Sequence, residues 1–498
     1  AFWENILMTK KKLLTKSKYL TGLQCSKYQW VMFNEPDRIP KPDAITQHRF
    51  DQGHLIGELA KKLFSDGIDI SADDFKGNIR QTEELLKKRK PLFEAGFMVD
   101  NIFCRVDVLK PVNNDEWDII EVKSSTEVKP INIHDVSFQM HCCNKRGLKI
   151  RECHLMHINN EYIRGSKIDP ASLLTITELT TEVEVIINGI QQRIDTMTST
   201  ISSKQCPSVA IGKQCNDPYE CPLKDECWDF LPENNVFEMY RGKKKAFELI
   251  EKGIYTFMDI PDDLMLSEKQ GIQKACEISG KPHIEKEAIK LFLKTLEYPL
   301  YYMDFETYSD VIPPFEGTKS YQQIPFQFSL HVVDKDNATA RHYSFLADGT
   351  GDPRSEFIAS LKDKLGNNGS IVVYNQGFEK DILKKVANFL PEYDEWVEGL
   401  NDRIIDLLAP FRSFHYYHPK QKGSASIKKV LPALTGTNYD HLDISDGMSA
   451  SLTFVDILSN KFTEEEMIKI REDLEKYCAL DTEGMIWIVD KLKELVCK

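Results

Sequence analysis

Two acidic residues, Asp304 and Glu306, lie within the apolar stretch PLYYMDFETY at residues 299–308. A β-strand alternates its faces with a period of two residues, so both carboxylates would point to the same side of this stretch. Like charges on one face of a buried strand repel each other and lose hydration. A divalent cation would neutralise them, and the stretch therefore predicts a metal site.

Two later segments supply residue types that suit the same site. The segment SIVVYNQGFEKDILKKVANFL predicts a buried strand, a tight turn and a helix that carries Glu379 and Asp381 near its start. In LEKYCALDTEGM, Tyr477 and Asp481 are four residues apart and share one face of a long, amphipathic C-terminal helix. The chain order is thus an acidic pair on a strand, an acid after a turn, and a Tyr-x-x-x-Asp helix.

These ordered motifs resemble the DnaQ-like 3′–5′ exonucleases, in the branch with four acidic residues and a tyrosine. The resemblance covers residues 298–498 and implies a ribonuclease H-like α/β domain. It also implies hydrolysis of phosphodiesters with two Mg²⁺ or Mn²⁺ ions, one generating the hydroxide and the other stabilising the leaving oxygen. Tyr477 would orient the attacking water, and the metal ligands would be Asp304, Glu306, Glu379 and Asp481.

The second motif departs from the family pattern. The family usually has Asp at the position of Glu379, which is one methylene longer but still an oxygen ligand. Asp381 is the alternative, although it lies two residues further along the helix and would face elsewhere. Asp406, in DRIIDLLAPF, could be an accessory acid or an N-terminal cap, and we favour the structural role.

A second group of charged residues lies in FCRVDVLKPVNNDEWDIIEVKSS, residues 103–125, which predicts a β-hairpin. Glu121 and Lys123 share a face, and Asp107 can lie beside them on the paired strand. This arrangement resembles the PD-(D/E)xK nucleases. The resemblance implies that the two carboxylates bind Mg²⁺ or Mn²⁺, and that the lysine positions or activates water or stabilises the transition-state charge. A surface hairpin with alternating charges is the alternative.

The sequence after this hairpin resembles RecB-like nucleases. HDVSFQMHCCNKRGLKI places Gln139 on a helix that follows the motif, as in those enzymes. They often carry a metal-ligand histidine on an early helix, where FDQGHLIGELAKKLF has Gly57. His54 or Glu58 could replace that histidine, or the site could function without one.

Four of the twelve cysteines form a further pattern. Cys215, Cys221 and Cys227 are spaced six residues apart, and Cys25 lies far upstream. This arrangement resembles the iron–sulfur-stapled RecB-like nucleases and implies a [4Fe–4S] cluster that ties the ends of one domain together. Zn²⁺ bound by four cysteines and scattered free thiols are the alternatives, and Cys206 could replace one ligand.

Composition narrows the class of protein. The chain has 41% hydrophobic and 28% charged residues, ordinary values for a globular protein, and a net charge of −13. That charge counts against a purely electrostatic nucleic-acid binder, but not against a nuclease whose acidic site holds metal ions. We find no run of about 18 apolar residues and no convincing signal peptide, so we expect no membrane partner, no disulfide framework and a cytoplasmic protein.

We therefore predict an α/β chain that resembles a bacterial family fusing two nuclease domains. A RecB-like, restriction-endonuclease-like domain with an iron–sulfur staple would span residues 8–235, a helical connector 236–297 and the DnaQ-like domain 298–498. The implied function is metal-dependent hydrolysis of DNA that is single-stranded or has free ends. An RNA exonuclease is one alternative. Another is an N-terminal half that holds DNA without cutting it and feeds the exonuclease. Repair and defence against foreign DNA are both open.

Overall fold

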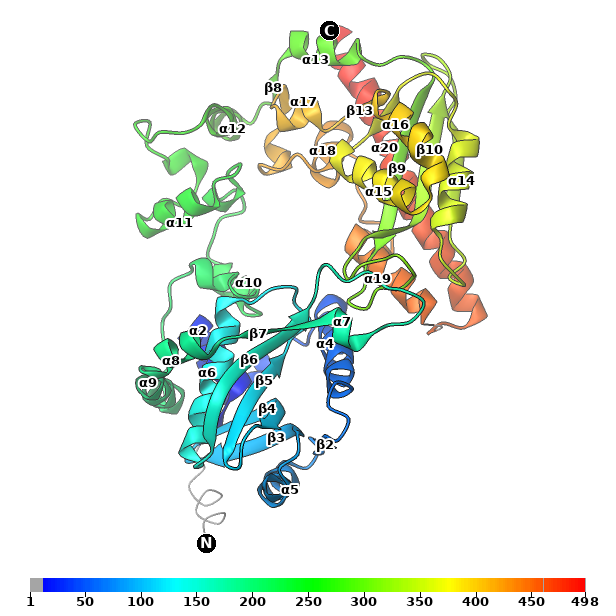
Figure 1. The fold of residues 1–498 in the computed structure, drawn as a ribbon. Helices are drawn as coiled ribbons and strands as arrows, with labels where there is room; N and C mark the ends of the chain where they lie inside the picture. The colour runs from blue at the N-terminus through cyan, green and yellow to red at the C-terminus, as the bar shows by residue number, and fades with distance from the viewer. Residues whose placement is uncertain (1–11, 460, 498) are drawn as a thin grey trace. The chain divides into compact units, whose positions relative to one another are not determined.

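The computed structural model describes residues 12–459 and 461–497; residues 8–11, where the predicted first domain begins, lie outside them. The chain is a mixed α/β protein, which confirms the predicted class, and it divides into two compact units (Figure 1). The first unit runs to Phe230 and also includes Asp310–Tyr321, and the second consists of Leu231–Ser309 and Gln322–Lys498. In the part of the chain that the structure describes, no helix is long and apolar enough to cross a membrane.

A seven-stranded sheet forms the centre of the first unit. Its strands are β1 (Leu14–Thr15), β2 (Ile68–Asp69), β3 (Leu92–Val99), β4 (Ile102–Pro111), β5 (Glu116–Val122), β6 (Lys149–Ile158) and β7 (Leu174–Glu178). The strands follow one another from β2 to β7, and β1 pairs in parallel with the start of β4. Strands β4 and β5 are antiparallel, which confirms the predicted hairpin. Strands β5 and β6 are parallel and are joined by the crossover helix α6 (Pro130–Lys145).

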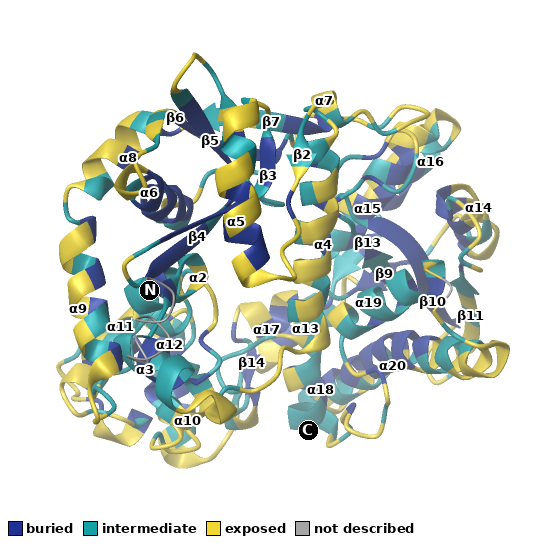
Figure 2. Cartoon of the chain, turned by 90° about the horizontal axis from the view of Figure 1, so that it is seen from below, coloured by how far each residue is buried: buried dark blue, intermediate teal, exposed yellow. Residues whose placement is uncertain are grey.

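Helices cover both faces of this sheet. Successive residues of each strand point to opposite sides, and both sides carry apolar residues that helices bury. On one face Leu92, Leu109 and Ile119 pack in a core with α6 and with α2 (Lys16–Gln24), α8 (Thr180–Ile187) and α9 (Ile190–Ser202). On the other face Phe93 and Val108 pack with α4 (Ala44–Lys61). Figure 2 accordingly shows buried strands and helices that are exposed on their outer sides.

Shorter elements complete the first unit. They are α3 (Ser26–Asn34), η1 (Pro36–Arg38), α5 (Phe75–Leu85), η2 (Leu86–Lys88), α7 (Pro170–Leu173), η3 (Lys213–Cys215) and α10 (Lys224–Trp228).

The segment Asp310–Tyr321 belongs to the first unit although the strands on either side of it belong to the second. Val311 is fully buried in the core under α4. The Arg164 guanidinium donates to the carbonyl oxygens of Pro313 and Pro314, at 2.7 and 2.5 Å. The backbone N–H of Tyr321 bonds the carbonyl of Asp310 at 2.8 Å, which closes the segment at its base.

A five-stranded sheet forms the centre of the second unit. Its order is β11 (Arg341–Leu346), β10 (Ile324–Val333), β9 (Leu300–Tyr308), β12 (Ile371–Val373) and β13 (Ile404–Asp406). The first three strands are antiparallel, and β12 and β13 run parallel to β9.

The two faces of this second sheet have different chemistry. Met303 and Phe305 of β9 point to an apolar core shared with α14 (Arg354–Lys364), α15 (Gln376–Phe389) and α16 (Asp394–Asn401). The opposite face, which carries Asp304 and Glu306, packs against the long helix α20 (Glu464–Cys497) and against α19 (Gly447–Leu458). The strand–turn–helix around Glu379 and the long C-terminal helix are therefore both confirmed.

The remaining elements of the second unit are short. Those before the sheet are η4 (Val236–Glu238), α11 (Lys243–Glu251), η5 (Phe257–Asp259), α12 (Glu268–Ser279), β8 (His283–Ile284) and α13 (Lys286–Leu293). Between β12 and β13 lies η6 (Pro391–Tyr393). After β13 follow α17 (Ala409–Arg412), β14 (Tyr416–Tyr417), η7 (Pro419–Gln421) and α18 (Ile427–Thr435).

Candidate functional site

Four carboxylates come together around Asp304 of β9, and we call them the carboxylate cage: Asp304, Glu306, Glu379 and Asp481. Asp304 and Glu306 lie on β9, opposite Ser329 and Gln327 of β10. The two carboxylates and the thiol of Cys478, on α20, each have a potential ligand atom within 4.8 Å of the others. The structure thus brings together the residues that the three sequence motifs single out.

Burial and mutual repulsion favour the protonated forms of the cage residues. Desolvation, with the charge of Asp481, raises the pKa of Asp304 well above its usual range, and the pKa of Glu306 rises for similar reasons. Burial and the charge of Asp304 raise the pKa of Glu379 to about 9, and burial raises that of Asp481 to about 6. A bound cation would relieve this repulsion.

Glu379 has an unused ligand atom. Its side chain is 1% exposed, and its Oε2 atom accepts no hydrogen bond from any described residue. An unpaired buried carboxylate oxygen is costly unless a cation or water meets it. Carboxylate oxygens are the ligands that Mg²⁺ and Mn²⁺ prefer, so the donor set fits these ions.

The two alternative acids lie outside the cage. Asp381 is exposed and forms an ion pair with Lys385 at 2.6 Å, so it faces away, as its helix position predicts. Asp406 accepts hydrogen bonds from the backbone N–H groups of Asn375 and Leu408, both at 3.0 Å. Asp406 therefore fixes the turn before α15, which agrees with the structural role favoured from the sequence.

Besides Cys478, sequence reasoning missed two residues near this site. The Tyr439 hydroxyl donates to Oδ1 of Asp481 at 2.5 Å. The ammonium of Lys428 lies 4.8 Å from the ring centre of Tyr477 and 5.4 Å from that of Tyr439. Its charge opposes the rise in the pKa of Asp304, Glu306 and Asp481. Lys428 lies in the basic stretch HPKQKGSASIKK, where nothing distinguishes it from its solvent-facing neighbours.

A buried polar chain supports the helix turn that carries Asp481. Thr482, the next residue, shares a 2.7 Å hydrogen bond with Ser329 and a 2.8 Å bond with Nδ1 of His331. Ser329 also bonds His342, whose ring stacks on that of His331. Burial lowers the pKa of His331 to about 4, so at neutral pH this chain is uncharged and fixes α20 to β10.

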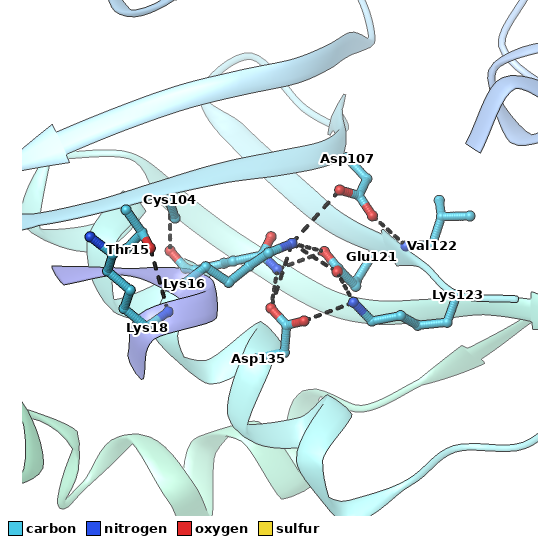
Figure 3. A network of polar contacts seen from close by, with 10 residues as sticks. Thr15, Lys16, Lys18, Cys104, Asp107, Glu121, Val122, Lys123 and Asp135 are labelled. Carbon is cyan, nitrogen blue, oxygen red and sulfur yellow. Dashed lines mark hydrogen bonds and ion pairs between the residues drawn. The ribbon is translucent and has the colours of Figure 1, made fainter. Parts of the chain in front are cut away.

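The predicted residues of the first unit also come together, with two additions (Figure 3). We call the group the lysine centre: Lys16, Asp107, Glu121, Lys123, Asp135 and Gln139. Asp107 accepts a 2.8 Å hydrogen bond from the backbone N–H of Val122, beside Glu121. Lys123 donates to Glu121 at 2.5 Å and to Asp135 at 2.9 Å. Lys16 and Asp135 carry no local signal in the sequence.

Charges within the lysine centre are already paired. Burial alone would raise the pKa of Glu121, but the ammonium groups of Lys123 and Lys16 outweigh it and hold that pKa well below its usual range. Burial and the nearby charge of Glu121 raise the pKa of Asp107 to about 7. Burial alone would lower the pKa of Lys16, but the carboxylates of Asp135, Glu121 and Asp107 raise it well above its usual range.

The early helix adds nothing to this centre. On α4, His54 and Glu58 are both exposed, and Glu58 forms an ion pair with Lys61 at 2.6 Å. A Cβ atom at Gly57 would meet no atom within 4 Å. Neither His54 nor Glu58 forms a hydrogen bond or ion pair with a described residue of the lysine centre.

The four cysteines of the predicted cluster line one pocket: Cys25, Cys215, Cys221 and Cys227. Burial raises the pKa of the Cys221 thiol to about 11, and the other three thiols add to the rise. Lys27 donates to the sulfur of Cys227 at 3.2 Å. Cys206 packs on the same apolar cluster as Cys221 and Cys227, but it does not line the pocket. The structure therefore brings the predicted set together across about 200 positions of sequence.

The chain is similar to a domain of unknown function and to uncharacterized proteins, and none of these similarities names an activity. Residues 301–426, which include Asp304, Glu306 and Glu379, match a domain of unknown function, DUF2779. The chain is 30% identical over 216 residues to the uncharacterized protein MG366 of Mycoplasma genitalium, covering 40% of this chain and 32% of that protein. It is 26% identical over 235 residues to the uncharacterized protein UU173 of Ureaplasma parvum, covering 43% and 34%. The matches thus span about a third of the length of these curated relatives.

Proposed function

We propose that the chain is a metal-dependent nuclease whose second unit is a DnaQ-like 3′–5′ exonuclease. One observation carries this proposal: four carboxylates, three of them buried and Asp304 partly buried, converge without enough positive charge, and Oε2 of Glu379 has no donor among the described residues. Such a cage is unfavourable unless cations fill it. The mixed sheet, with its carboxylates between β9, α15 and α20, supports a ribonuclease H-like fold.

When bound, two Mg²⁺ or Mn²⁺ ions would supply the hydroxide and stabilise the leaving oxygen. The four cage residues would hold them. Burial and the charge of Asp481 raise the pKa of Tyr477, so its hydroxyl stays protonated and can donate a hydrogen bond that orients water. Tyr439 holds one oxygen of Asp481 in place, and Lys428 supplies a positive charge toward a negative substrate.

For the first unit we propose a RecB-like PD-(D/E)xK fold. The support is the β4–β5 hairpin with Asp107, Glu121 and Lys123, followed by a crossover helix whose Gln139 donates to Glu121 at 2.7 Å. Whether this unit cuts DNA or holds it for the exonuclease depends on whether its carboxylates bind a metal ion.

We further propose a [4Fe–4S] cluster in the pocket of the four cysteines. Four thiolates suit a [4Fe–4S] cluster, and Zn²⁺ bound by the same four cysteines is the alternative. Lys27, which donates to the sulfur of Cys227, would offset part of the negative charge of the cluster.

The substrate we propose is DNA with a free 3′ end, hydrolysed in the cytoplasm. RNA remains the rival substrate because DnaQ-like folds act on both polymers. End-labelled single-stranded and double-stranded DNA and RNA should be incubated with Mg²⁺ or Mn²⁺ and the products resolved by length. The native chain should shorten DNA stepwise from the 3′ end, and Asp304→Ala should lose this activity.

The matched control is Asp381→Ala, which removes a carboxylate two positions from Glu379 but outside the cage, and which should retain activity. Full exonuclease activity in an Asp304→Ala, Asp481→Ala double variant would overturn the proposal.

A further inference from the structure

Lys16 reaches the lysine centre because of how the first residues of the described chain pair with the sheet. Strand β5 pairs with β4 only from Val108 onward, and β1 pairs instead with the start of β4, at Ile102 and Phe103. Thr15 then caps α2, so Lys16 is the first residue of that helix. Figure 3 shows its side chain extending from α2 toward the carboxylates.

The ammonium of Lys16 contacts carboxylates on three sides. Its Nζ lies 2.8 and 3.0 Å from the two oxygens of Glu121, 3.7 Å from Asp135 and 3.8 Å from Asp107. Asp107 and Glu121 are the two residues that the PD-(D/E)xK pattern assigns to the metal. A partly buried ammonium is thus bound where these carboxylates would bind a divalent cation.

The remaining acceptor capacity of Glu121 is also used. A carboxylate offers about four lone-pair sites. On Glu121, Lys16 and Lys123 donate to Oε1, whereas Lys16 and Gln139 donate to Oε2. Glu379 differs from Glu121 in this respect, because Oε2 of Glu379 has no hydrogen-bond donor among the described residues.

The net charge of the lysine centre also argues against a bound divalent cation. Three carboxylates of the lysine centre face two ammonium groups. A divalent cation added to this group would turn a nearly balanced cluster into a positive one and would repel both lysines. The donor set, as the side chains lie, does not fit Mg²⁺ or Mn²⁺.

We infer that Lys16 takes the place of the divalent cation, so that the lysine centre is a metal-free ion-pair cluster. The first unit then cuts no phosphodiester by a metal-assisted route at this centre. This inference goes beyond the proposed exonuclease and stands on the contacts of the first unit alone.

Mn²⁺ binding tests the inference directly. The background is Asp304→Ala with Asp481→Ala, which disables the carboxylate cage, and bound Mn²⁺ is counted by electron paramagnetic resonance of the free ion. Adding Glu121→Gln to this background isolates the lysine centre, since any Mn²⁺ left in the cage is common to both proteins. We expect the same Mn²⁺ count with and without Glu121→Gln. A count that falls by one ion per chain on Glu121→Gln would overturn the inference, and this comparison needs no change at Lys16.

The variant Lys16→Met provides a second Mn²⁺-binding test. Removing the ammonium leaves three carboxylates facing Lys123 alone, so we expect this variant to gain one Mn²⁺ per chain and to melt at a higher temperature when Mn²⁺ is added. The gain should disappear when Glu121→Gln is added.

Lys18→Met is the matched control, because Lys18 lies on the same helix but packs over the ring of Phe33 at 4.1 Å. It should gain no ion. A Lys16→Met protein that folds and gains no Mn²⁺ would contradict the inference. Since all these measurements are made with the cage disabled, failure here leaves the exonuclease proposal untouched, and loss of that proposal leaves these outcomes unchanged.

Discussion

The hydroxyl of Tyr439 donates a 2.5 Å hydrogen bond to Oδ1 of Asp481, a residue 42 positions further along the chain. The bond favours the ionised form of Asp481 and so opposes the effect of burial, which raises the pKa of this carboxyl to about 6. It also holds Oδ1 of Asp481 in one position, and Tyr477 adds a second, weaker hydrogen bond to the same carboxyl. Tyr439 is therefore a positioning residue for the carboxylate cage.

Tyr439→Phe should weaken Mn²⁺ binding at the cage about tenfold, the low end of what losing such a supporting contact costs. Mn²⁺ titration of the nuclease activity and direct counting of bound ion both measure this effect. Tyr477→Phe is the comparison: it should lower the maximal rate, because it removes a water-orienting hydroxyl, and should weaken Mn²⁺ binding less than Tyr439→Phe, because its hydrogen bond to Asp481 has the smaller effect on that carboxyl. Equal Mn²⁺ affinity in native protein and Tyr439→Phe would exclude the positioning role.

Lys428→Met should shift the acidic limb of the pH–rate profile to higher pH. The Lys428 charge lowers the pKa of Asp304, Glu306 and Asp481, and these carboxyls must lose their protons before they bind metal. Without that charge, protons compete with the metal up to a higher pH. Profiles at several Mn²⁺ concentrations measure the shift.

Lys429→Met is the control for this change, because Lys429 is the exposed neighbour of Lys428 and is not among the main influences on the pKa of any cage residue. A profile shifted equally by both variants would mean that general surface charge, not the position of Lys428, is responsible.

Without metal, the stability of the protein should fall as the pH rises. Burial raises the pKa of Glu379 from its ordinary 4.5 to about 9, so between these values the folded state keeps a proton that the unfolded chain releases. The stabilisation is complete below about pH 4.5 and is lost toward pH 9, at up to about 1.4 kcal/mol per pH unit for this one group. Urea unfolding in the presence of a chelator measures the slope.

Glu379→Gln should flatten this dependence, because the amide does not titrate. Excess Mn²⁺ should make the native protein more stable as the pH rises, since deprotonated ligands bind metal more tightly. The same slope in both proteins would contradict the assignment of the raised pKa to Glu379.

The sequence predicted those parts of the site that local periodicity controls. Asp304 and Glu306 share a strand face, and Tyr477 and Asp481 share a helix face, because alternation in a strand and the turn of a helix follow from spacing alone. The turn before Glu379 was also predictable. Asn375 there adopts a left-handed conformation, with φ of 90°, which asparagine tolerates better than most residues.

Residues that join the centres from distant segments could not be predicted in this way. Lys16 bonds Glu121 from 105 positions away, and its place depends on β1 pairing at the free edge of β4. Lys428 and Tyr439 reach the cage from segments between the second and third motifs, where no period relates them to Asp481. The docking of Asp310–Tyr321 in the first unit likewise depends on Arg164, nearly 150 residues earlier in the chain.

The cluster proposed for the cysteine pocket predicts the colour of the purified protein and its iron and sulfide content. Anaerobically purified protein should be brown and contain iron and sulfide in about the proportion of one [4Fe–4S] cluster per chain. Cys221→Ser should lose the iron and lower the melting temperature of the first unit. Cys206→Ser should retain the iron, because Cys206 does not line the pocket. One zinc per chain without iron would retain the site but exclude the cluster.

Finally, the segment Asp310–Tyr321 should behave as part of the first unit in solution. Arg164→Met removes the Nη1 donor that bonds the carbonyls of both Pro313 and Pro314, and Pro313 is buried, so about 1–3 kcal/mol of local stability should be lost. Hydrogen exchange should then speed up in this segment and around Val311, while the helices of the second unit stay protected. Lys319→Met is the control on the same segment, because its ion pair with Glu161 is largely exposed and contributes little. The segment begins four residues after Glu306, so exonuclease activity should be recorded in parallel. Unchanged exchange in Arg164→Met would show that the two carbonyl bonds do not hold the segment in place.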